Sequence, residues 1–76
     1  MKLPQVSGKE VLKVLVKEGF EVKRQKGSHV HLVKITPAKT FHVTVPVHGS
    51  VDLNPFVFRC IARQAGFTTD EFAKLF

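Results

Sequence analysis

The residues best suited to chemistry form a short basic stretch that ends in histidine: Arg24, Gln25, Lys26, Gly27, Ser28 and His29. An imidazole can take up or release a proton near neutral pH, as general acid–base catalysis requires. The cations attract a phosphate, a serine hydroxyl can donate to its oxygens, and glycine permits a close approach. The stretch therefore indicates a phosphodiester site. A histidine held only by local hydrogen bonds in a turn remains an alternative.

Alternating apolar residues predict the sheet that must position these groups. The alternation runs over residues 20–25, 28–35 and 40–45, with turns at 26–27 and 36–39 between them, and the first run predicts a half-buried strand. Short connections predict an antiparallel meander. If the apolar positions face a core, the other face carries four polar residues of the second and third strands, His29, His31, His42 and Thr44, and Lys23 of the first.

Helix signals flank the strands. Ser7 and Glu10 have capping-box spacing, and Thr68 repeats it with Glu71 near the chain end. Asn54 followed by proline predicts the start of another helix. The sequence thus predicts one α+β domain over residues 1–76, with three antiparallel strands in α-β-β-β-α order. Both main helices should cover one sheet face, and a short helix should end the chain. Double-stranded-RNA-binding domains have this arrangement.

Charge favours an anionic partner. Twelve Lys and Arg against six Asp and Glu give a net charge of +6 and a pI near 9.9, which in a small domain favours nucleic acid. Lys9, Lys13 and Lys17 form a stripe that suits phosphates or is simply a solvated helix face. No apolar run approaches the roughly 20 residues of a membrane span. A polar start without a signal peptide and a single cysteine predict a cytoplasmic protein.

The motif Lys26-Gly27-Ser28-His29-Val30-His31, after a helix and a strand, resembles the signature of HicA-type toxins, also called YcfA-like mRNA interferases. The resemblance continues through Val45-Pro46 with His48, through residues 58–66 and through residues 69–72, so it covers nearly the whole chain. One departure is Phe56-Val57-Phe58, where the family has small residues before a leucine. These phenylalanines indicate a larger core or a partner-facing apolar patch.

The resemblance implies the toxin of a type II toxin–antitoxin system, with a double-stranded-RNA-binding-like fold. It implies ribosome-independent cleavage of mRNA and one essential histidine, His29, with Gly27 and Ser28 shaping its turn. It also implies a HicB-type antitoxin that covers the active face. The expected partners are therefore RNA and this antitoxin, with no membrane and no small-molecule cofactor.

A hypothesis for the chemistry is metal-independent endoribonuclease action, with His29 as general acid or base on an RNA that carries its own nucleophile. The second proton transfer stays open between His31, a lysine and water. The residues expected to bind RNA are Lys23, Arg24, Lys26, Gly27, Ser28 and His31. A zinc site of His29, His31 and His42 would lack a nearby fourth ligand. The alternative function is a non-catalytic RNA-binding module.

Overall fold

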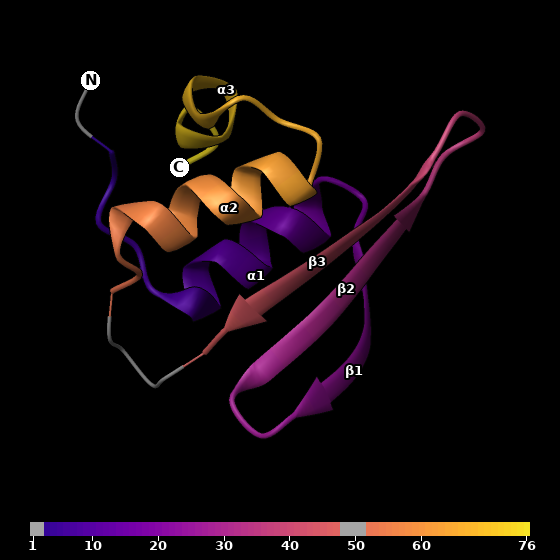
Figure 1. Ribbon diagram of the computed structural model, residues 1–76, viewed down its shortest axis with the longest axis horizontal. Helices are drawn as coiled ribbons and strands as arrows, with labels where there is room; N and C mark the ends of the chain where they lie inside the picture. Colours follow the sequence, from indigo (N-terminus) through magenta and orange to yellow (C-terminus); the bar gives the residue numbers. More distant parts are fainter. Residues whose placement is uncertain (1–2, 48–51) are drawn as a thin grey trace.

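The computed structural model of the protein describes residues 3–47 and 52–76. Its helices and strands follow the predicted order (Figure 1). They are α1 (Gly8–Lys17), β1 (Glu21–Lys26), β2 (His29–Ile35), β3 (Thr40–Pro46), α2 (Pro55–Gln64) and α3 (Thr69–Ala73). His48, which belongs to the resemblance described above, lies outside the described residues.

The three strands form one antiparallel sheet in the order β1-β2-β3. The helices lie on one side of this sheet, and the other side is left open (Figure 1). Val30 and Leu32 of β2 and Val43 and Val45 of β3 are buried on the covered side. The predicted α+β class, with an α-β-β-β-α order and a short C-terminal helix, is therefore confirmed.

Each helix begins at the polar residue that the sequence indicates. The Glu10 amide donates to the Ser7 hydroxyl at 3.4 Å, and the Val57 amide donates to the Asn54 side chain at 2.9 Å. These bonds satisfy amides that have no partner within the helix. The starts of the helices are thus fixed by local chemistry.

The capping box of α3 also affects the ionisation of its acidic member. The Thr68 amide donates to the Glu71 carboxylate at 2.8 Å, and this bond, with a second one from the Thr68 side chain, lowers the pKa of that carboxyl. A lowered pKa means that the box stabilises the folded chain above the ordinary carboxyl pKa. That contribution disappears as pH falls through the lowered value.

Aromatic rings join α2 and α3 above the sheet. Phe58 and Phe72 are almost completely buried, and their ring centroids lie 5.0 Å apart. Phe76 packs against both rings at 5.7 and 5.2 Å. The short α3 is therefore held mainly by its phenylalanines, since five helical residues are too few to be stable alone.

The expectation that the first strand is half-buried was wrong. All six residues of β1 are exposed, and Val22 keeps 47% of its surface. The helices pack mainly against β3, at the opposite edge of the sheet, so they cover little of β1. Phe20, which begins the apolar alternation, is buried but precedes the strand. Hydrogen bonds to β2 are thus the main attachment of β1.

Candidate nucleic-acid interface

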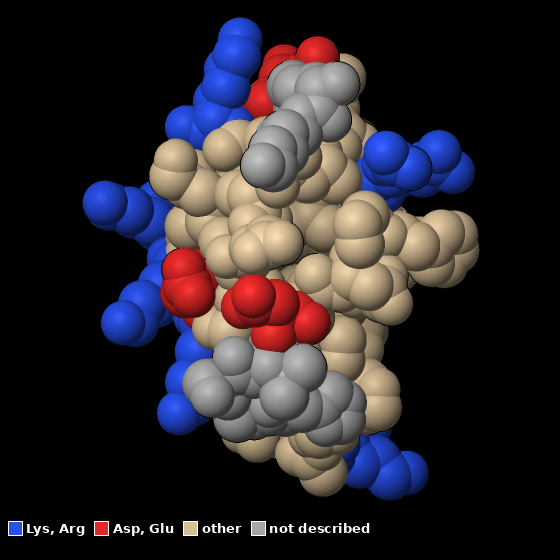
Figure 2. Space-filling view, turned by 90° about the vertical axis from the view of Figure 1, so that its left-hand side faces the viewer, with Lys and Arg blue, Asp and Glu red and all other residues tan. Residues whose placement is uncertain are grey.

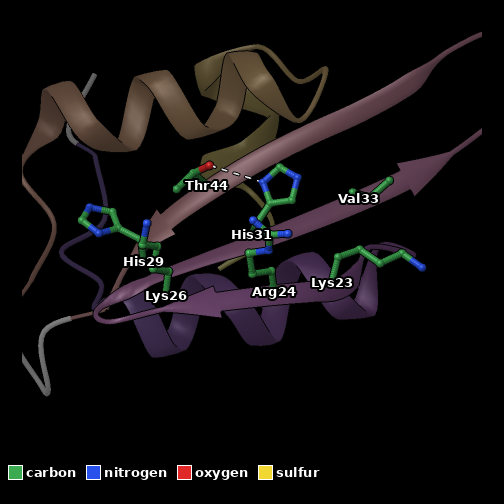
Figure 3. A pocket seen from close by; sticks show the side chains of 7 residues that line it. All are labelled: Lys23, Arg24, Lys26, His29, His31, Val33 and Thr44. Atoms are coloured by element: carbon green, nitrogen blue, oxygen red, sulfur yellow. Dashed lines mark hydrogen bonds between the residues drawn. The ribbon is translucent and has the colours of Figure 1, made fainter.

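A shallow depression of about 590 Å³ lies on the open face of the sheet. Its lining is mostly basic or imidazole side chains from β1 and β2, with one residue of β3 (Figure 3). The lining residues are Lys23, Arg24, Lys26, His29, His31, Val33 and Thr44. The structure therefore brings together five of the seven residues that the sequence predicts for the site.

A β-bulge decides which basic residues of β1 reach the depression. Val22 lies opposite Leu32, but Arg24 lies opposite His31, so Lys23 is an extra residue in β1. Without the bulge, strict alternation would place Arg24 on the helix-covered face. Because of this extra residue, the side chains of Arg24 and Lys26 point to the open face of the sheet. Lys23, Arg24 and Lys26 consequently all line the depression.

The two remaining predicted residues form the turn that begins β2. Gly27 has φ +58, a left-handed conformation that favours glycine, and nothing lies within 4 Å of a Cβ built there. The carbonyl of Ser28 accepts a 2.6 Å hydrogen bond from the Val47 amide, which ties this turn to the end of β3. Gly27 and Ser28 therefore shape the turn, but they do not line the depression.

The turn sets the position of the histidine that follows it. His29 is the first residue of β2, is exposed, and lies between Lys26 on β1 and Pro46 on β3 in the strand register. Figure 3 shows its ring at one end of the depression, apart from the ring of His31. An imidazole placed beside a cationic neighbour on an open sheet is accessible to a large ligand such as a nucleic-acid strand.

His31 occupies the middle of the depression and has a partner on each side. Its Nδ1 lies 3.5 Å from the Thr44 hydroxyl, and its Nε2 lies 3.4 Å from Nδ1 of His42. The rings of His31 and His42 are stacked, with centroids 5.5 Å apart. Alternation predicted that these three side chains share a face, but not that they touch. Val33 also lines the depression, and the alternation that places His31 on the open face could have found it, because Val33 lies two residues further along β2.

His29, His31 and His42 do not come together as a metal site. Among residues 3–47 and 52–76, no group of three His, Cys, Asp or Glu side chains is placed to hold a metal ion. His31 and His42 pair with each other, whereas the His29 ring lies apart from His31 (Figure 3). The zinc alternative raised by the sequence therefore has no support in the arrangement of these rings.

Acidic side chains neutralise little of the positive charge at the depression. Within the part of the chain that the structure describes, the one ion pair joins Lys23 and Glu21, at 3.4 Å. Both side chains are largely exposed, so this pair contributes little stability. Figure 2 shows a different face, where acidic side chains gather in the middle and Lys and Arg project at both margins.

A comparison with protein families decides the identity of the chain. Residues 8–67 match the family model described as the HicA toxin of bacterial toxin-antitoxin. The chain belongs to the HicA toxin family. No curated protein sequence matches it. The matched residues of this HicA-family chain include every residue that lines the depression.

Membership assigns the chain a role as the toxin of a bacterial toxin–antitoxin pair, so an antitoxin is its partner. The resemblance seen in the sequence is thereby confirmed at the level of the family. None of the helices in the described ranges is long and apolar enough to cross a membrane.

Proposed function

We propose that this HicA toxin is an endoribonuclease that cleaves mRNA without a metal ion. The observation that carries the proposal is the position of His29 in a depression whose other side chains include Lys23, Arg24 and Lys26. A proton-transferring group beside three cations matches the two needs of phosphodiester cleavage, which are proton movement and charge stabilisation. In this proposal the chain acts as a single domain over residues 1–76, in the cytoplasm, where mRNA is found.

RNA supplies the nucleophile for the proposed reaction. His29 accepts the proton of a ribose 2′-hydroxyl while that oxygen forms a bond to the adjacent phosphorus. The bond from phosphorus to the 5′-oxygen of the next nucleotide breaks, and that oxygen takes a proton from a second donor, for which His31, a lysine and water are the candidates. The products are a 2′,3′-cyclic phosphate and a 5′-hydroxyl. His29 can instead serve as the general acid toward the leaving oxygen, with another base acting on the hydroxyl.

The basic residues of β1 have distinct parts in this reaction. Arg24 lies opposite His31 in the strand register and can present two N–H donors to one phosphate. Lys26 lies opposite His29, so its charge is available where negative charge develops on the phosphate. Gly27 and Ser28 hold the turn in which His29 begins β2. These roles cover four of the six residues that the sequence indicates for RNA binding, all except Lys23 and His31.

Cleavage of a long single-stranded RNA in the presence of EDTA tests the function. We expect the wild-type protein to fragment RNA and to leave DNA of the same sequence intact, because DNA lacks the 2′-hydroxyl. The RNA fragments should carry 2′,3′-cyclic phosphate ends. If the protein retards RNA on a gel yet never cuts it, the chain is a non-catalytic RNA-binding module and the proposal is wrong.

Arg24→Ala and Lys26→Ala should each weaken RNA binding and lower its dependence on salt. Every lost phosphate contact should reduce the slope of log K against log salt by about 0.7 for a single strand. Lys39→Ala is the matched control, because Lys39 is exposed in the turn at the other end of β2. Fluorescence anisotropy with a labelled 2′-O-methyl RNA provides the measurement. If all three variants show the salt dependence of the wild type, RNA binds elsewhere.

We propose further that the antitoxin is of the HicB type and that it covers the basic depression. An acidic surface on the antitoxin would complement the net charge of +6 and speed association at low salt. An antitoxin seated there would exclude RNA from His29 directly. Competition between the antitoxin and 2′-O-methyl RNA for the toxin would support this placement, and simultaneous binding of both would contradict it.

A further inference from the structure

The contact between His31 and Thr44 follows from their place in the ladder between β2 and β3. These residues are directly opposite each other. The Thr44 amide points away from β2 and donates to the side-chain oxygen of Gln64 on α2, at 3.3 Å. Thr44 and His31 are therefore a non-hydrogen-bonded pair of the ladder, in which opposing side chains come closest. This explains why the hydroxyl reaches Nδ1 of the imidazole.

His42 completes a row of three side chains. It lies two residues before Thr44 on β3, diagonal to His31, at a separation that aromatic rings can span. Its ring stacks on that of His31, and Nδ1 faces His31 Nε2 at 3.4 Å. Both ring nitrogens of His31 are thus engaged, whereas the contacts of His42 leave its Nε2 at the outer end of the row.

This row accommodates one extra proton but not two. If His31 is an imidazolium, both its N–H groups donate, one to the Thr44 oxygen and one to Nδ1 of a neutral His42. The Thr44 hydroxyl and the Nε2–H of His42 then point outward as donors. If His42 were also charged, two N–H donors would face each other across 3.4 Å. The singly protonated row therefore carries one positive charge and presents only donors to a ligand.

The groups that face this row favour an anion. Arg24 of β1 lies opposite His31, and Lys26 and His29 line the same depression. Lys23 is also present, with its charge partly offset by Glu21. From α2 the contact is the uncharged Gln64. An anion bound beside the row stabilises the imidazolium form of His31, so binding can draw a proton onto the row.

We propose that His31, His42 and Thr44 form a phosphate-binding site that takes up a single proton together with an RNA phosphate. This inference rests on the proposed function, because it assigns the site to a phosphate flanking the one that is cleaved. His42 becomes an RNA-binding residue, and His31 holds the shared proton rather than acting on the 2′-hydroxyl. Binding linked to uptake of one proton weakens as pH rises, by up to about tenfold per pH unit.

The binding test uses 2′-O-methyl RNA, which cannot be cleaved, across about pH 5 to about pH 8, the range in which histidine charge changes. Wild-type affinity should fall as pH rises, by up to about tenfold per unit. His42→Phe keeps an aromatic ring but removes the nitrogen that accepts from His31, so it should bind less tightly and with a smaller dependence on pH. Thr40→Val is the control, because Thr40 is exposed on β3 and outside the row. Equal pH dependence in His42→Phe and wild type would overturn the proposal.

A second measurement separates this site from catalysis. Inorganic sulfate, whose charge is constant over this pH range, should shift the ring NMR signals of His31 and His42 near pH 6 and much less near pH 8. RNA cleavage is measured separately on a gel. If sulfate shifts the ring signals but the protein does not cleave RNA, the phosphate site is supported and the nuclease proposal is contradicted. Cleavage without any shift at His42 would support the nuclease and overturn the site.

Discussion

Replacing His29 with alanine is expected to slow RNA cleavage by about 10²- to 10⁴-fold, the usual contribution of general acid–base catalysis. The side chain is exposed at the start of β2, so its removal should leave the fold intact. Lys23, Arg24 and Lys26 remain in place, so binding of RNA should persist. We therefore expect His29→Ala to lose RNA cleavage but to keep its affinity for RNA.

Ile35→Ala provides a matched control for this substitution. Ile35 lies on the same strand, at the same alternation as His29, and keeps 75% of its surface exposed. Cleavage should be measured under single-turnover conditions, with and without added imidazole. Partial rescue of His29→Ala by imidazole would identify the lost group as a proton carrier. A rate for His29→Ala equal to that of Ile35→Ala would show that His29 is not catalytic.

Replacing Phe58 with alanine is expected to destabilise the protein by about 3–5 kcal/mol, the usual cost of emptying a buried aromatic site. Phe58 is 1% exposed and contacts the rings of Phe72 and Phe76, so its loss also loosens α3. At roughly 0.05–0.15 kcal/mol per residue, a domain of 76 residues has a total stability of about 4–11 kcal/mol, so this loss is a large share of it. Urea unfolding followed by circular dichroism measures the change.

The same helix offers a control two residues away. Phe56 is 73% exposed, and an exposed substitution is usually neutral to within about 0.5 kcal/mol. Phe56→Ala should therefore unfold at the urea concentration of the wild type. Similar midpoints for Phe58→Ala and Phe56→Ala would contradict the packing described for α2. Of the two phenylalanines in Phe56-Val57-Phe58, Phe58 is part of the core, while Phe56 faces solvent.

Local signals made much of the fold predictable. Ser7 and Thr68 cap helices through contacts within their own turn, and Asn54 with its following proline does the same. Alternation in β2 and β3 is equally local, because buried and open positions follow each other along one strand. It correctly placed His31, His42 and Thr44 on the open face.

What the sequence did not predict depends on contacts between strands. The bulge at Lys23 is visible only once β1 is paired with β2, yet it determines that Arg24 and Lys26 reach the depression. The hydrogen bond between His31 and His42 likewise needs the register of β2 against β3. The prediction that β1 is half-buried was wrong for a related reason, because composition does not show how far the helices extend across the sheet.

Because β1 is exposed on both sides, mutations in it differ in their effect from mutations in β2 and β3. Residues of β2 and β3 alternate between the core and the depression, so mutations there risk the fold as well as the site. Residues of β1 contact no helix closely, and most of the cations of the depression lie on it. Its charges can therefore be changed at little thermodynamic cost to the fold. A substitution in β1 alters the charge of the depression without disturbing the core.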